Sequence, residues 1–217
     1  IMAQDWMSDS TKKVALDKLA SFYVKIGYPN KWRDYSALDI HNDNYFANTL
    51  RASAFEFDYM VNKKLNKPVD RDEWEMTPQE VNAYYNPTTN EICFPAGILQ
   101  PPFFDMEADD AYNYGSTGAT IGHEMTHGFD DEGSQFDKNG NLRVWWKDSD
   151  RKSFNERTKV MADYYSNINV LPNLKCNGEL TLGENLADHG GLMVAYQAYK
   201  DITKDAPLPV KDGYTAD

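Results

Sequence analysis

The stretch Thr120-Ile-Gly-His-Glu-Met-Thr-His-Gly-Phe-Asp130 decides how this sequence is interpreted. It places His123, Glu124 and His127 in the pattern H-E-x-x-H. On an α-helix, positions four apart return to nearly the same face, so both imidazoles can reach one ion. Glu124 follows the first histidine and would lie beside the open position of that ion. Two neutral nitrogen ligands and a nearby carboxylate are what a hydrolytic zinc centre needs.

An ordinary helix with two hydrogen-bonded histidines and a solvated glutamate is the structural alternative. A random chain of this length would match three fixed positions about once in a couple of hundred cases. The metal site is therefore the stronger hypothesis on this motif, and the plain helix stays open.

Composition limits the classes of partner. The chain has 217 residues, enough for one sizeable core or one and a half domains. Its 22 basic and 34 acidic residues give a formal net charge of −12, which argues against nucleic acid as a partner. Hydrophobic residues make up 41% of the chain, and no run approaches the length of a membrane span.

The cysteines and the N-terminus say little about targeting. Cys93 and Cys176 are too few for a disulfide framework and lack the spacing of a metal site, so we expect both to be unpaired. No charged-then-apolar leader follows Ile1, and we expect this segment to begin inside a longer protein.

Apolar periodicity predicts two helices in the first third of the chain. The first follows cap residues at 8–11 and runs to about Ile26. The second runs from Asp43 to Lys67, before Pro68. The residues expected to face a core are Val14, Leu19, Phe22, Tyr23 and Ile26 in the first helix, and Phe46, Leu50, Phe57, Met60 and Val61 in the second.

Turn signals and caps organise the rest. Residues 81–86 and 91–94 flank a Pro-Thr-Thr-Asn turn and predict a hairpin, and the turn at 139–141 predicts another. Helices are expected from Asp148 or Ser149 to about Tyr165 and from near Thr181 onward, with a loop at 171–177 between them.

Three glycines form one stripe on the helix that carries the motif. Gly115, Gly118 and Gly122 lie at i, i+3 and i+7, and each costs about 0.5–1 kcal/mol relative to alanine in a helix. The stripe predicts that another backbone packs very close to this face. The alternative is that the helix begins only at about Ser116.

A catalytic zinc needs a third protein ligand. With only four histidines in the chain, a carboxylate is the expected ligand, and Glu184 is the best candidate. Glu184 and Asp188 are four apart at a helix start, so Glu184 could bind the ion while Asp188 accepts the second N–H of a ligand histidine. His189 falls elsewhere around the helix and is expected at the surface or behind the site.

Taken together, these motifs resemble the neprilysin family of zinc metallopeptidases. The matching stretches follow the family's order and run almost throughout the chain: Trp6-Met7, Ile26-Gly-Tyr-Pro29, Asp72-Glu-Trp74, Val81-Asn-Ala-Tyr-Tyr85, residues 94–104, Asn113-Tyr-Gly115, residues 121–131, Trp145-Trp146, Asn177-Gly178 and residues 182–191.

The resemblance implies a role for each matching residue. It makes His123, His127 and Glu184 the zinc ligands, Glu124 the general base, and Asp188 the residue that orients His123. It also implies that Asn82 and Ala83 hydrogen-bond the substrate backbone along an edge strand, the mode called β-augmentation. Ile98 and Phe103 would help to line the pocket for the residue after the scissile bond.

The resemblance further implies an α+β, mainly helical fold with a thermolysin-like zincin core and a small sheet or hairpins, incomplete at both ends. Residues 1–67 would lead from the lid region into a partial catalytic domain at 68–217. The implied activity is zinc-dependent endopeptidase cleavage of oligopeptides on the amino side of bulky apolar residues. A metal-bound scaffold or peptide-binding module without catalysis is the alternative.

The implied partners are a peptide substrate and the remainder of the same protein. That remainder comprises a helical lid domain and a C-terminal part with a further histidine for the transition state, either in the same polypeptide or as a separate chain. We therefore expect this chain alone to be weakly active or inactive. An extracytoplasmic location is favoured, with the cytoplasm as the alternative.

Overall fold

The computed structural model describes residues 1–42, 44–205, 210 and 213–214. The chain divides into two compact units: unit 1 comprises Ile1–Tyr28 and Met76–Asp217, and unit 2 comprises Pro29–Glu75. The predicted boundary between residues 67 and 68 therefore differs from the compact units, because the first 28 residues pack within unit 1. Helices dominate and the sheets are small, so the mainly helical α+β prediction is confirmed.

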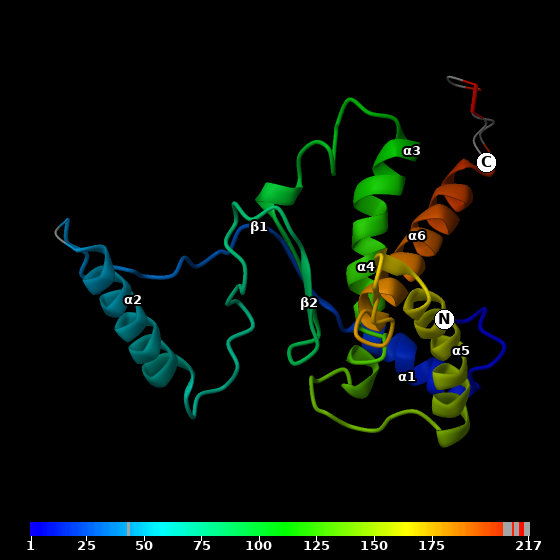
Figure 1. The fold of residues 1–217 in the computed structure, drawn as a ribbon, viewed down its shortest axis with the longest axis horizontal. Coiled ribbons are helices and arrows are strands. Elements are labelled where there is room, and N and C mark those ends of the chain that lie inside the picture. The colour runs from blue at the N-terminus through cyan, green and yellow to red at the C-terminus, as the bar shows by residue number, and fades with distance from the viewer. Residues whose placement is uncertain (43, 206–209, 211–212, 215–217) are drawn as a thin grey trace. The chain divides into compact units, whose positions relative to one another are not determined.

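Unit 1 begins with a helix and a strand, α1 (Asp9–Ala20) and β1 (Tyr23–Gly27) (Figure 1). The prediction of one helix to about Ile26 is wrong over its last residues. The segment from Tyr23 is rich in β-branched and aromatic side chains, and it pairs in parallel with β3 (Glu91–Pro95).

The predicted inward face of α1 also needs correction. The structure buries Thr11, Ala15 and Lys18, whereas Val14 is 40% exposed. Of the residues that follow the helix, Phe22 packs against the apolar core, but Tyr23 and Ile26 are exposed on β1. A long cationic side chain lies inside because two backbone carbonyls accept hydrogen bonds from it.

The predicted hairpin at 81–94 is present. β2 (Tyr84–Asn86) pairs antiparallel with β3, and the sheet has the order β1-β3-β2, which leaves β2 at an edge. Ile92 and Phe94 of β3 form a cluster of buried apolar residues with Ala83 and Ile98.

The motif helix is one continuous helical path from Asp110 to His127. It consists of α3 (Asp110–Asn113), a π-helical turn η3 (Tyr114–Gly118) and α4 (Ala119–His127). The alternative start at Ser116 is therefore wrong.

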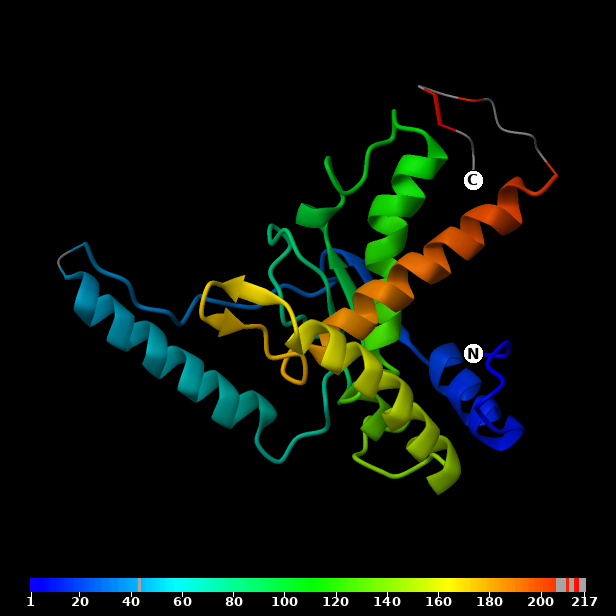
Figure 2. The same cartoon turned by 45° about the vertical axis from the view of Figure 1, so that its right-hand side comes forward.

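The helix α6 (Leu182–Thr203) crosses α4 at closely packed backbones, and Figure 2 shows the crossing. A Cβ atom at Gly122 would lie 2.7 Å from the carbonyl oxygen of Gly191. The predicted close approach is thus confirmed at Gly122. Around Gly118 the contacts are ordinary, and a Cβ atom at Gly115 would meet nothing within 4 Å.

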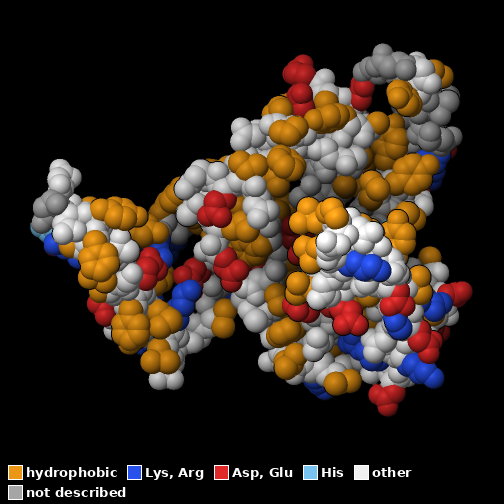
Figure 3. All heavy atoms as spheres, viewed as in Figure 1, with side chains coloured by type: hydrophobic (Ala, Val, Ile, Leu, Met, Phe, Trp, Pro, Cys, Tyr) orange, Lys and Arg blue, Asp and Glu red, His pale blue; other side chains and the backbone are white. Residues whose placement is uncertain are grey.

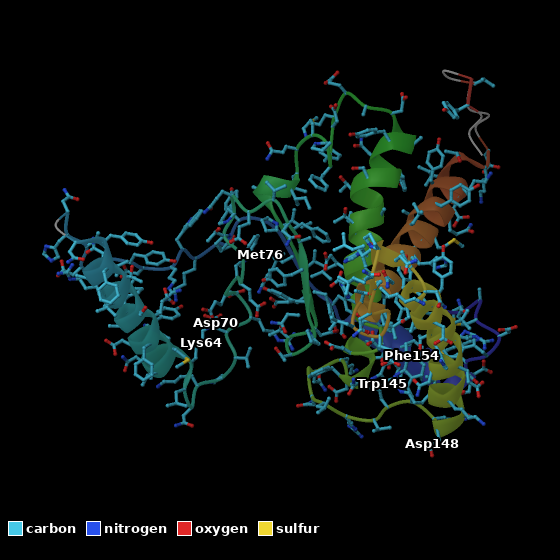
Figure 4. The ribbon with its side chains drawn as sticks, viewed as in Figure 1. Lys64, Asp70, Met76, Trp145, Asp148 and Phe154 are labelled. Carbon is cyan, nitrogen blue, oxygen red and sulfur yellow. The ribbon has the colours of Figure 1, made fainter. Side chains whose placement is uncertain are left out.

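The remaining elements of unit 1 frame this crossing. α5 (Asp148–Ser166) carries Phe154, which packs with Met7 and Trp146 in a second apolar cluster, and Trp145 lies beside it (Figure 4). The turn at 139–141 closes only a single antiparallel bridge, between Phe136 and Leu142. The predicted loop at 171–177 includes part of a short hairpin, β4 (Asn169–Leu171) and β5 (Leu174–Lys175).

Unit 2 holds α2 (Tyr45–Tyr59) and a π-helical turn η1 (Met60–Lys64). The predicted start at Asp43 lies outside the described residues. The prediction of an inward face is wrong for Phe46, Leu50, Phe57 and Met60, which are 49–69% exposed. Val61 is half-buried, and α2 has no buried residue.

Apolar side chains accordingly gather on the surface of α2 (Figure 3). Within unit 2, the segment around Arg33 contacts this helix, and the guanidinium carbon of Arg33 lies 3.9 Å from the ring centre of Tyr59. That segment is too short to cover the apolar face of a helix.

Among the described residues, no helix combines the length and the apolar character needed to cross a bilayer.

Candidate metal centre

The two histidines of the motif face one another from successive turns of α4. Their Nε2 atoms lie 2.9 Å apart, and the rings meet edge to face. Each Nδ1 atom has a carboxylate partner: Asp188 lies 2.8 Å from His123, and Asp130 lies 2.7 Å from His127. Because carboxylates accept hydrogen bonds, a proton on each Nδ1 would complete both bonds and leave each Nε2 free to bind an ion.

Glu184 approaches the same point from the first turn of α6. Its Oε2 atom lies 3.4 Å from Nε2 of His123 and 3.6 Å from Nε2 of His127. The structure thus brings together the three residues that the sequence suggested as ligands, although they come from two helices. Their role as ligands stays a prediction.

The donor set fits a zinc ion. Two ring nitrogens and a carboxylate oxygen converge on one point, where all three could donate lone pairs to a cation. Two nitrogen ligands and one carboxylate oxygen match the composition of catalytic zinc sites. His123, Glu124 and His127 also offer ligand atoms within 4.8 Å of one another. We favour Glu184 over Glu124 as the third ligand because its oxygen faces both Nε2 atoms.

Glu124 has a different environment from Glu184. It is 5% exposed, and burial raises its pKa, with the nearby histidines opposing the shift. The backbone N–H of Tyr85, on the edge strand β2, donates a hydrogen bond to it. A carboxylate held against the edge strand and beside the histidines is placed to exchange a proton with a bound substrate.

Asp130 is a site residue that sequence reasoning did not identify. It lies just past the end of α4, is buried, and holds His127 as Asp188 holds His123. Burial disfavours the charged form of His127, but the hydrogen bond and charge of Asp130 outweigh it and raise the pKa of the ring. The i, i+3 spacing from His127 to Asp130 is the signal that could have revealed this contact.

A cleft of about 340 Å³ opens above the centre, entirely within unit 1. Its walls include Asn82 and Ala83 on one side and His123, Glu124, His127 and Glu184 on the other. The predicted pocket residues Ile98 and Phe103 are not among the residues that line it. They pack in or against the apolar cluster behind Ala83. His189 is exposed, and it is not among the residues at the centre.

The two cysteines play no part in this arrangement. Both are free, and burial raises the pKa of the Cys93 thiol to about 12, so this thiol stays protonated near neutral pH.

Comparison with known proteins identifies the family. The model of Peptidase family M13 matches residues 82–217. The chain is 47% identical over 207 residues to human endothelin-converting enzyme 1. That alignment covers 92% of this chain and 26% of that protein. It is 44% identical over 218 residues to Neprilysin-11 of Caenorhabditis elegans. That alignment covers 96% of this chain and 26% of that protein.

A solved structure agrees with these matches. The zinc metalloprotease Zmp1 of Mycobacterium tuberculosis, in complex with an inhibitor, superposes with a TM-score of 0.94 at 50% identity. The match covers 99% of this chain and 34% of Zmp1. The chain thus spans about a quarter of the length of the curated relatives. It belongs to Peptidase family M13, the neprilysin family of metallopeptidases.

Proposed function

We propose that this chain carries the zinc-binding part of an endopeptidase that hydrolyses oligopeptides on the amino side of bulky apolar residues. The observation that carries the proposal is the convergence of the two Nε2 atoms with the carboxylate of Glu184. Zinc, held by His123, His127 and Glu184, would act as a Lewis acid toward water and the substrate carbonyl.

The residues around the ion would divide the remaining work. Glu124 would take a proton from the attacking water and deliver it to the leaving amine. Such transfer by a positioned side chain contributes about 10²–10⁴-fold to a rate. Asp188 and Asp130 would hold the two imidazoles in the tautomer that leaves Nε2 free.

The peptide would bind along the edge strand β2. Asn82 and Ala83 immediately precede this strand and line the cleft, so their polar groups can pair with an extended backbone. The preference for a bulky apolar residue after the scissile bond rests on the resemblance to the family, and Ile98 and Phe103 would support it from the apolar cluster that includes Ala83, a residue of the cleft wall. The remainder of the family's length, a lid domain and a C-terminal part, is the proposed partner that completes the enzyme.

A chimera tests the activity, because the rest of Zmp1 supplies the parts of the family that this chain does not include. This chain would replace the matching third of Zmp1, and cleavage of a quenched fluorescent peptide with a central Phe would be followed. We expect cleavage before Phe and none with Glu124→Gln in the chimera. A correctly folded, zinc-loaded chimera that cleaves no peptide would contradict the proposal.

A further inference from the structure

The two carboxylates that hold the imidazoles lie in opposite environments. The side chain of Asp188 is 77% exposed, whereas that of Asp130 is 6% exposed. Water can stabilise the charge of the first. The second needs compensation from the protein, because an uncompensated buried carboxylate is costly.

Part of that compensation comes from the backbone. Asp130 Oδ1 accepts hydrogen bonds from the N–H groups of Glu132 at 3.0 Å and Gly133 at 2.7 Å. These bonds fold residues 130–136, here called the 130–136 turn, back against α4. A Cβ atom at Gly133 would lie 1.8 Å from the carbonyl oxygen of His127, so the backbone of the turn packs directly against the end of the helix.

A buried lysine from a distant part of the sequence holds this turn. Lys18, on α1, is 1% exposed, and its Nζ donates to the carbonyl oxygens of Gly133 at 2.7 Å and Phe136 at 2.8 Å. The rings of Tyr85, Phe129 and Trp145 surround the ammonium within 5.7–5.9 Å. Burial lowers the pKa of Lys18 to about 8, and the nearby charge of Asp130 opposes that shift.

We propose that Lys18 is a positioning residue for the metal centre: it holds the 130–136 turn and stabilises Asp130, which in turn fixes the ring of His127. The inference rests on the proposed zinc site but concerns residues behind it. The path has three links, from Lys18 to Gly133, from Gly133 to Asp130, and from Asp130 to His127.

Other side chains also donate hydrogen bonds to the 130–136 turn, and comparison with them shows which contacts depend on Lys18. Trp146 donates to the carbonyl oxygen of Ser134, and Arg151 reaches the same residue. These contacts hold Ser134, and the indole N–H of Trp145 donates to the carbonyl oxygen of Phe136, but none of them reaches the carbonyl oxygen of Gly133, whose N–H donates to Asp130. Removing Lys18 should therefore loosen Gly133 and the hydrogen bond from its N–H to Asp130, while Ser134 and Phe136 keep their other donors.

A double-mutant cycle tests this chain of contacts. The full 217-residue chain would be prepared with Lys18→Met, Asp130→Asn and both changes, and its zinc affinity measured by competition with a chromogenic chelator. We expect Asp130→Asn to weaken binding about 10- to 100-fold, as is typical for a direct partner of a ligand histidine. Lys18→Met should weaken binding by a smaller factor, and the double variant should match Asp130→Asn alone.

Additive losses would overturn the proposal, because a lysine that only stabilises the fold would act independently of Asp130. Zinc affinity equal to that of the unmodified chain in folded Lys18→Met would overturn it as well. Lys25→Met is the matched control: Lys25 is a second buried lysine, but its 2.8 Å ion pair is with Glu91. This variant should lose stability and keep its zinc affinity.

A second readout does not depend on zinc. In metal-free protein, long-range proton–nitrogen spectra report which ring nitrogen of His127 carries the proton. We expect Nδ1–H in the unmodified chain and a mixture of tautomers in Lys18→Met, with His123 unchanged. If the unmodified chain binds no zinc, the proposed function fails while this measurement still tests Lys18. If Lys18→Met does not fold, Lys18→Gln, a neutral donor, replaces it in both experiments.

Discussion

The crossing of α4 and α6 and the helix α2 use apolar and small residues in opposite ways. At the crossing, Gly122 and Gly191 let two backbones touch, and the candidate ligands are held within a few ångströms of one another. On α2, large apolar side chains repeat at helical spacing, yet none is buried within unit 2.

The difference teaches what each kind of pattern determines. An apolar stripe on a helix shows that a face is suited to burial, but it does not say which surface covers that face. A glycine at a position with no room for a Cβ atom indicates that a neighbouring backbone packs directly against it. Substitutions at the crossing should therefore be costly, and those on α2 should not.

The largest effect is expected on peptide turnover when Glu124 of α4 is changed. Glu124→Gln in the Zmp1 chimera should keep zinc and lower kcat by at least about 10²–10⁴-fold, because the amide cannot accept a proton. Zinc content by atomic spectroscopy and peptide turnover would be measured together. Unchanged turnover would remove Glu124 from its role as base.

The other helix of the crossing supplies the next test. Glu184→Ala removes the carboxylate that faces both Nε2 atoms, so zinc binding should fall by more than the roughly 10- to 100-fold typical of a supporting residue. Chelator competition on the 217-residue chain measures it. His189→Ala, one residue after Asp188, is the control and should bind zinc normally. Stoichiometric, tight zinc in Glu184→Ala would exclude the ligand role.

The packing at the crossing can be tested by a matched pair of glycine variants. A Cβ atom at Gly191 would lie 2.5 Å from the backbone nitrogen of His123, whereas one at Gly115 would meet nothing within 4 Å. Gly191→Ala should lower the free energy of unfolding by about 3 kcal/mol and weaken zinc binding. Gly115→Ala should be neutral or stabilising by up to about 1 kcal/mol. Urea unfolding curves measure the free energy of unfolding of both variants. Equal losses would contradict the difference in packing between the two glycines.

Lys18 provides a test through pH. Burial lowers its pKa to about 8, while Asp130 and Asp137 oppose the shift. Between about pH 8 and the unfolded pKa near 10.4, the unfolded chain binds more protons at this site than the folded chain. Stability contributed by Lys18 therefore rises with pH in that window.

Relative to Lys18→Met, the unmodified chain should gain on the order of 2–3 kcal/mol between pH 7 and pH 10. Chemical unfolding of both proteins at several pH values isolates the lysine from other titrating groups. A constant difference across the window would show that the buried amine does not titrate there.

The smallest effect is expected on α2. Leu50 is 57% exposed, so Leu50→Ala should change the free energy of unfolding of the 217-residue chain by no more than about 0.5 kcal/mol. A cost of several kcal/mol would mean that this side chain is buried in solution and that the contrast with the crossing is weaker than the structure indicates.

The sequence predicted the parts of the centre that depend on local geometry. His123 and His127 face the same point because they are one helical turn apart, and the same spacing places Glu184 and Asp188 on one side of α6. The hairpin and the close approach at Gly122 also followed from short patterns, which the structure bears out.

Prediction failed where burial depends on distant partners. The helical spacing of Tyr23 and Ile26 predicts a helix over β1, and only pairing with β3 decides for the strand. Phe46 and Leu50 were expected inside because they are apolar, but unit 2 offers no surface that covers them.

The sequence by itself determined which side chains share a helical face, and hence that two imidazoles and a carboxylate could serve one ion. Only the tertiary structure decided that α4 and α6 cross at Gly122 and Gly191, and that Asp130 and Lys18 are buried behind His127. The physical reason is that helical periodicity depends on nearby residues alone, whereas burial and charge compensation depend on which surfaces meet.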